Sequence, residues 1–169
     1  MRMVNVPLEF LDTFQASVIK GNAGELSALA GSMEVRRLTR HINPTAWISQ
    51  VSSKGVDSAG SFKDPASFVR DLAKRERQYI NHCTRGRWWS CYIGCVVVLT
   101  GKVDYVSDGE RVVALKNGHH NLGKITGSGC ILGSCIATYC AAAAALSDDQ
   151  SSSSYKLVDG DMFLSAIAG

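Results

Sequence analysis

A glycine-rich turn followed by a long apolar run is the feature that most constrains this chain. Gly127, Ser128 and Gly129 form the turn, and Cys130 opens a stretch of small and apolar residues that continues to Ala145. Glycine lets a ligand approach the backbone, and the first amides of a helix have no partner within the helix. Together with the helix dipole, these amides favour an anion. The pattern predicts a phosphate-binding turn at the start of a long, largely buried helix that begins near Cys130.

A short β-branched strand and a hairpin are expected just before this turn. Residues 96–99 read Val-Val-Val-Leu, which is typical of a buried strand, and Thr100 and Gly101 end it. Residues 104–109 and 111–115 read as two short strands around an Asp-Gly turn. This half of the chain therefore follows the order strand, hairpin, glycine turn and helix.

The front of the chain contains another short strand and the start of a helix. Residues 18–19 are expected to form a very short buried strand. Asn22 and Glu25 have the spacing of a capping box, in which Asn22 caps the helix and Glu25 reaches back to the Asn22 backbone N–H. Two further helices are expected to start at Asp64 and at Asp161.

The six cysteines are interpreted as free thiols of an intracellular protein, because no secretory signal is recognisable in the sequence. Cys135 and Cys140 are expected to be core residues of the apolar helix. No stretch of about 20 apolar residues is found, so no membrane-spanning segment is expected.

Two segments, residues 36–50 and 78–95, do not fit the pattern of strands and helices. They contain all three tryptophans and no acidic residue. The net charge of +3 depends on their five arginines, since it would be −2 without them. We interpret both segments as inserts, translated from unspliced intron sequence.

These segments leave two other interpretations open. A small basic nucleic-acid-binding module would combine their arginines and tryptophans, because mixed aromatic and basic side chains bind single strands. Its members would be Arg36, Arg37, Arg40, Trp47, Arg85, Arg87, Trp88 and Trp89. A zinc site would use His82, Cys83, Cys91 and Cys95, but their spacing does not match a zinc knuckle. The favoured expectation is that the chain binds neither nucleic acid nor a membrane.

The residues around the turn and the strands resemble the ribokinase-like kinases, and within them the hydroxyethylthiazole kinase family. The resemblance rests on the stretches VIKGNAGELSALAGS, VVVLTGKVDYVSDG and NGHHNLGKITGSGCILGSCIA. Most ribokinase-like enzymes have an aspartate at the last position of the glycine turn, whereas a cysteine there, as Cys130 here, marks the thiazole kinases. The resemblance implies an α/β chain with a partial ribokinase-like three-layer fold, in which helices flank a mostly parallel sheet.

The resemblance also implies a reaction. The family transfers a phosphoryl group from ATP, with Mg²⁺, to the primary alcohol of 4-methyl-5-(2-hydroxyethyl)thiazole, a step of thiamine biosynthesis in the cytoplasm. Such a transfer depends mainly on positioning and charge neutralisation. The family's pocket lies at the interfaces of a homotrimer, so a homo-oligomer is implied as well.

A role for each candidate residue follows from the same resemblance. Amides around Gly127, Ser128 and Gly129 would neutralise the transferring phosphoryl group, and Cys130 stands where related kinases place their base. Gly127 would also contact the thiazole substrate. The remaining candidates are Lys20, Thr100 and Gly101 for ATP, and Asn22 and Glu25 for Mg²⁺.

The resemblance covers the C-terminal part of the family domain. It implies that the first strands of the sheet and much of the thiazole pocket have no counterpart before Met1. In the fungal enzymes, the kinase usually follows a thiamine-phosphate synthase domain. A catalytically inactive kinase fragment is therefore an alternative to an active enzyme.

Overall fold

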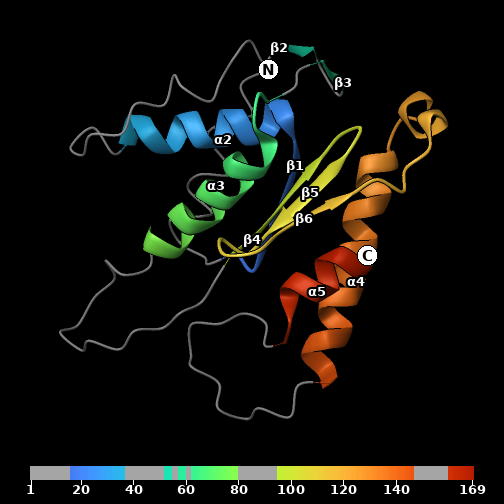
Figure 1. The fold of residues 1–169 in the computed structure, drawn as a ribbon. Helices are drawn as coiled ribbons and strands as arrows, with labels where there is room; N and C mark the ends of the chain where they lie inside the picture. The colour runs from blue at the N-terminus through green and yellow to red at the C-terminus, as the bar shows by residue number, and fades with distance from the viewer. Residues whose placement is uncertain (1–15, 37–51, 55–56, 60–61, 80–94, 147–159) are drawn as a thin grey trace.

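A four-stranded sheet lies at the centre of the structure (Figure 1). The computed structural model describes residues 16–36, 52–54, 57–59, 62–79, 95–146 and 160–169. The sheet has the order β1-β4-β5-β6. Its strands are β1 (Val18–Asn22), β4 (Val96–Thr100), β5 (Asp104–Ser107) and β6 (Val112–Leu115). β1 runs parallel to β4, whereas β4 with β5 and β5 with β6 are antiparallel pairs.

The antiparallel part of the sheet follows from a tight turn between β5 and β6. Gly109 has a φ of 93°, which favours glycine, and the amides of Glu110 and Arg111 donate to Asp108 Oδ1 at 2.9 and 2.7 Å. A turn this short joins only antiparallel neighbours. The predicted Asp-Gly hairpin is confirmed, and together with the antiparallel pair of β4 and β5 it makes the described sheet mixed instead of mostly parallel.

Helices cover both faces of this sheet (Figure 1). The helices are α2 (Ala23–Arg36) and α3 (Pro65–Tyr79) on one face, and α4 (Ser128–Leu146) and α5 (Met162–Ala168) on the other. Successive residues of a strand point to opposite faces. Val97 and Leu99 of β4 therefore pack with α2 and α3, while Val96 and Val98 pack with α4 and α5. The predicted α/β three-layer arrangement is confirmed, with one apolar core on each side of the sheet.

Two smaller elements complete the described structure. β2 (Ser52–Lys54) and β3 (Asp57–Ala59) form a short antiparallel pair of their own. A 3₁₀ helix, η3 (His120–Lys124), lies between β6 and α4. The sequence interpretation did not include either element.

Aspartates cap α3 and α5, as the sequence predicts. The Ser67 amide donates to Asp64 Oδ1 at 3.1 Å, and the Leu164 amide donates to Asp161 Oδ1 at 3.0 Å. Each side chain satisfies an amide that has no partner within its helix. Both helices therefore begin where a short acceptor side chain precedes an apolar face.

α4 is much more exposed than its apolar sequence predicts. Ile136 and Cys140 are buried, but Tyr139 and Leu146 are 51% and 83% exposed. The prediction of a largely buried helix is wrong for the described structure, and Cys135, expected in the core, is exposed as well. The reason is that apolar residues surround the whole helix, whereas the sheet and α5 cover only one stripe of it.

α4 is also long and apolar enough to cross a membrane, judged by length and composition alone. The expectation that the chain has no such stretch is wrong by this criterion. One helix of this kind is weak evidence for a membrane span, because core helices of soluble proteins pass the same test. In the structure, α4 packs on α5 and on the sheet.

Several sequence interpretations lie outside the described residues. The inserts expected at 36–50 and 78–95 are described only at Arg36, at 78–79 and at Cys95. The three tryptophans, the other arginines of the basic module and three members of the candidate zinc set are not described. Cys95 itself is buried, and its thiol donates to the carbonyl of Val96 at 3.7 Å.

Candidate functional site

The carboxyl ends of β1 and β4 meet at one edge of the sheet. The two strands are parallel and pair Gly21 with Leu99 and Asn22 with Thr100. The Thr100 hydroxyl donates to the Gly21 carbonyl at 3.4 Å, which links the last residues of the two strands. Ligands of open α/β sheets bind outside such carboxyl ends. A ligand site of this chain is therefore expected at this edge, where Asn22 and Thr100 end their strands.

The glycine turn leads into α4 in the expected manner. Gly127 has a φ of 91°, and its carbonyl accepts hydrogen bonds from the amides of Cys130 and Ile131, both at 3.0 Å. The helix begins at Ser128, two residues earlier than expected. The amides of Ser128 and Gly129 precede these first donors, so the helix itself leaves them without a partner. The prediction of a preformed turn at the start of a helix is confirmed.

Lys20 connects β1 to this turn. Its ammonium donates to the carbonyl of Gly129 at 2.7 Å, across 109 positions of sequence. The side chain is half-buried and lines the space between β1 and α4. A positive charge next to the positive end of a helix dipole is unfavourable unless an acceptor or an anion lies close by. The first turn of α4 contains no acidic residue.

Asn22 and Glu25 form the capping box that the sequence predicts. The Glu25 amide donates to Asn22 Oδ1, and the Asn22 amide donates to Glu25 Oε2, both at 2.9 Å. Glu25 is exposed, and within the described residues no hydrogen bond engages its Oε1. The capping role is therefore confirmed, and one carboxylate oxygen stays open at the sheet edge.

The structure contains no preformed metal cage in the part of the chain that it describes, where no three His, Cys, Asp or Glu side chains come together. This arrangement is compatible with Mg²⁺ bound through one carboxylate and the phosphates of a nucleotide, since Mg²⁺ in phosphate sites keeps several waters and few protein ligands. The carboxylate that fits this description is that of Glu25.

Thr100 and Gly101 follow β4 at the same edge. The Gly101 amide donates to Asp104 Oδ1 at 2.8 Å, so this amide is already engaged. Thr100 is half-buried, and its hydroxyl is directed to the Gly21 carbonyl. Any contact of these two residues with a ligand would have to use other atoms or a rearranged turn.

Cys130 lies exposed in the first turn of α4. Its carbonyl accepts a hydrogen bond from the Ser134 hydroxyl at 3.2 Å. No hydrogen bond to its thiol is found among the described residues. The geometry thus gives the thiol access to solvent without an evident partner.

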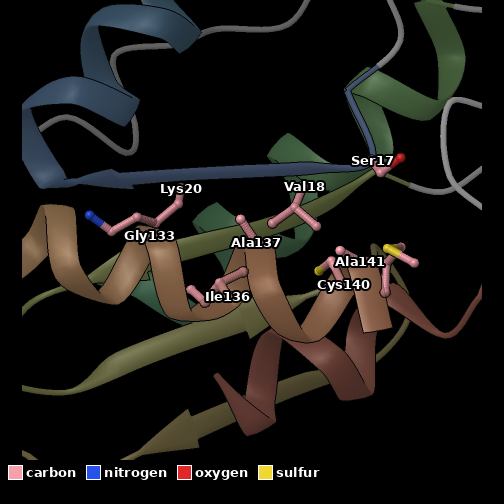
Figure 2. Close-up of a pocket in the computed structure, with 9 residues that line it drawn as sticks. Ser17, Val18, Lys20, Gly133, Ile136, Ala137, Cys140 and Ala141 are labelled. Carbon is pink, nitrogen blue, oxygen red and sulfur yellow. The ribbon is translucent and has the colours of Figure 1, made fainter. Parts of the chain in front are cut away.

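A groove of about 310 Å³ between β1 and α4 is a feature that the sequence interpretation missed (Figure 2). Val18 and Lys20 point from β1 toward α4, where Gly133, Ala137 and Ala141 face them. These small residues recur every four positions and so form one stripe of the helix. That spacing is the signal from which the groove could have been inferred, because small side chains leave room beneath the strand.

Comparison with known proteins gives a consistent result. The model of the family described as hydroxyethylthiazole kinase matches residues 2–160. A hydroxyethylthiazole kinase of Methanocella arvoryzae is 34% identical over 132 residues, which are 78% of this chain and 37% of the relative. A hydroxyethylthiazole kinase of Pyrococcus furiosus is 37% identical over 117 residues, which are 69% of this chain and 32% of the relative.

A solved structure agrees with these relatives. The hydroxyethylthiazole kinase protein from Pyrococcus horikoshii OT3 superposes with a TM-score of 0.50 at 27% identity. The superposition covers 79% of this chain and 35% of that chain. The chain therefore spans about a third of the length of the proteins that it matches.

Proposed function

Because this chain belongs to the hydroxyethylthiazole kinase family, we propose that it carries the phosphate-handling part of an ATP-dependent kinase for 4-methyl-5-(2-hydroxyethyl)thiazole, in thiamine biosynthesis. The observation that supports this most is that strand β1 links three features through its hydrogen bonds. These are the Gly127–Gly129 turn, whose Ser128 and Gly129 amides have no partner within the helix, the Lys20 ammonium bonded to it, and the Glu25 carboxylate, one oxygen of which has no hydrogen bond among the described residues.

The candidate residues divide the work of phosphoryl transfer among them. The amides of Ser128 and Gly129, with the helix dipole, would stabilise negative charge on the phosphoryl group. Lys20 would add a positive charge beside them, and Thr100 and Gly101 would contact the nucleotide after β4. The Asn22 amide holds one oxygen of Glu25, and the other oxygen would be available to bind Mg²⁺. When bound, Mg²⁺ would supply positive charge against the phosphate oxygens.

Cys130 would position the substrate alcohol and assist as a weak base. Within the described residues, its thiol has no hydrogen bond through which a proton could be passed on. Cys130 lies in the first turn of α4, directly after the glycine turn that would hold the phosphate. Gly127 would contact the substrate on the other side of the turn. Positioning, and not proton removal, is therefore the larger contribution that we assign to Cys130.

We further propose a cytoplasmic homo-oligomer that binds neither nucleic acid nor a membrane. The support is the family itself, whose relatives are named hydroxyethylthiazole kinases. The comparisons do not favour a basic nucleic-acid module.

Nucleotide binding tests the proposal directly. We expect the full chain to bind ATP with Mg²⁺ at least about tenfold more tightly than AMP, because the site recognises terminal phosphates. Isothermal titration calorimetry of both nucleotides measures the ratio. Equal affinities for ATP and AMP, or no binding of either, would contradict the proposal.

A second candidate function, phosphate binding without turnover, is favoured by the Cys130 thiol, which has no hydrogen bond among the described residues that would help it act on an alcohol. An assay of ADP formation with the thiazole alcohol separates the two. Turnover near ~10 s⁻¹, a typical enzyme value, supports the complete kinase activity. Saturable ATP binding with no alcohol-dependent ADP supports the second candidate, and we expect this second result.

A further inference from the structure

We infer that Lys20 is a positioning residue, which fixes the glycine turn before any ligand binds. The inference rests on the proposed function only in naming the turn as a phosphate site. Its basis is the hydrogen bond of 2.7 Å from the Lys20 ammonium to the Gly129 carbonyl. Lys20 belongs to β1, where it pairs with Val98 of the buried strand β4. The ammonium thus ties the first turn of α4 to the centre of the sheet.

Gly133 lies beside the Lys20 side chain on α4 (Figure 2), and Gly129, one turn earlier in the helix, lies at its ammonium. A Cβ atom added to Gly133 would lie 3.8 Å from Lys20 Cδ, and one added to Gly129 would lie 3.2 Å from Lys20 Nζ. The first distance is ordinary contact, whereas the second is tighter than most real contacts of a Cβ. A side chain at position 129 would therefore require the Lys20 ammonium to shift by a few tenths of an ångström.

Charge explains why this contact prepares the site for an anion. The ammonium lies beside the positive end of the α4 dipole, and the first turn of α4 has no acidic residue to compensate it. The Gly129 carbonyl satisfies one of the three ammonium protons, which leaves two for another acceptor. An anion at the turn would thus meet a lysine already held in place, and its binding would not have to order that side chain.

The consequence can be measured in the free protein. Without the ammonium, the first turn of α4 should open more often, as helix ends do when they lose a side-chain contact. The amides of Cys130 and Ile131 report this opening, since both donate to Gly127. Amides around Ile136, further along the helix, report whether the fold remains intact.

Hydrogen exchange of the full chain, followed by NMR, is the test. We expect Lys20→Met to raise the exchange rates of the Cys130 and Ile131 amides about tenfold, the scale of one hydrogen bond to a charged group. Lys20→Arg should restore most of the protection, because it keeps a charged donor. Lys63→Met, at an exposed lysine before α3, should leave the rates unchanged.

Inorganic triphosphate, titrated into the same samples, separates this inference from the proposed function. Unchanged exchange in Lys20→Met, with weaker triphosphate binding, would show that Lys20 acts only as a charge and would overturn the inference. Raised exchange without triphosphate binding by the unsubstituted chain would support the inference while contradicting the phosphate site. The inference would also be overturned if the Cys130 and Ile131 amides exchanged equally fast in Lys20→Met and Lys20→Arg, and faster than in the unsubstituted chain, because a charged donor at position 20 would then give no protection.

Discussion

Single residues at the start of α4 determine whether its amides can receive a ligand. Gly127 adopts a φ of 91°, and a Cβ added to it would meet no atom within 4 Å. At Gly127, the backbone conformation, and not the available space, therefore limits which residue can be accommodated. At Gly129 the opposite holds, because its conformation is ordinary and the nearby Lys20 ammonium limits the space.

Gly127→Ala should lower the free energy of unfolding by about 1 to 2 kcal/mol, the cost of a left-handed conformation for a residue with a side chain. The matched control is Gly118→Ala, a position with open space and no positive φ. Urea unfolding of both variants measures the difference. A Gly127→Ala variant as stable as Gly118→Ala would mean that the turn has another conformation in solution.

Gly129→Ala and Gly133→Ala form a second matched pair, since both replace a glycine of α4. Alanine at 133 should raise the free energy of unfolding by up to about 1 kcal/mol through helix propensity. Alanine at 129 should give a smaller gain or a loss, because the Lys20 ammonium must move. In a Lys20→Met background the two substitutions should become similar. A double-mutant cycle by urea unfolding measures this coupling, and a coupling of zero at 129 would refute the contact.

Cys130→Ala should have little effect on nucleotide binding. The thiol is exposed and has no hydrogen bond among the described residues, so we expect the dissociation constant for ATP to change by no more than about twofold. Gly129→Val should weaken the same binding much more, since a branched side chain displaces Lys20 and covers the amides. Calorimetry measures the ATP affinity of both variants. A larger loss of affinity in Cys130→Ala than in Gly129→Val would mean that the thiol, and not the turn, is the main binding group.

Elements begin and end where short polar side chains can satisfy the backbone, and this is why their starts could be predicted. Asn22, Asp64 and Asp161 were each recognisable as caps from the sequence, and each accepts the expected amide. The exposure of α4 could not be predicted in the same way. Its residues are apolar on every side, so the sequence does not indicate which face the sheet covers.

The β5–β6 hairpin carries a pH-dependent contribution to stability at Asp108. Partial burial alone would raise the pKa of this carboxyl, but hydrogen bonds from the amides of Arg111 and Glu110 and from the Arg111 guanidinium lower it below its usual value. A carboxyl with a lowered pKa stabilises the fold above its unfolded pKa, near ~3.9. That contribution is lost as the pH falls through the lower, folded-state value.

Asp108→Asn should therefore reduce stability at pH 7 by about 1 kcal/mol, and by less at pH 3. Urea unfolding at both pH values gives the two differences. Other carboxyls titrate in the same range, so only the difference between the variant and the unsubstituted chain is informative. An equal loss at both pH values would show that the Asp108 charge makes no contribution.

At the scale of the whole molecule, features that depend on contacts between distant parts of the sequence could not be predicted from local patterns. The class of the fold followed from local patterns, because the strand at 96–99, the hairpin and the glycine turn are each encoded in a few adjacent residues. The bond between Lys20 and Gly129 joins residues 109 positions apart, and no local pattern predicts it. The groove beside it depends on the same approach of β1 to α4. The roles assigned to nucleotide, Mg²⁺ and substrate contacts stay predictions.

The exposed apolar side of α4 has a consequence for the behaviour of the whole chain in solution. Large exposed apolar surfaces promote association, and Tyr139 and Leu146 are the exposed side chains at the middle and the end of this helix. We expect the purified chain to self-associate as its concentration rises. Tyr139→Lys with Leu146→Lys should reduce this association without changing the fold, because neither side chain is buried.

Light scattering coupled to size exclusion, with circular dichroism on the same samples, measures both properties. The control is Ile136→Lys, which places a charge at a buried position of the same helix and should unfold the α4 side of the structure. If the double lysine variant associates as strongly as the unsubstituted chain, the association does not use this face of α4. If the unsubstituted chain stays monomeric at high concentration, the exposed apolar face of α4 does not drive self-association.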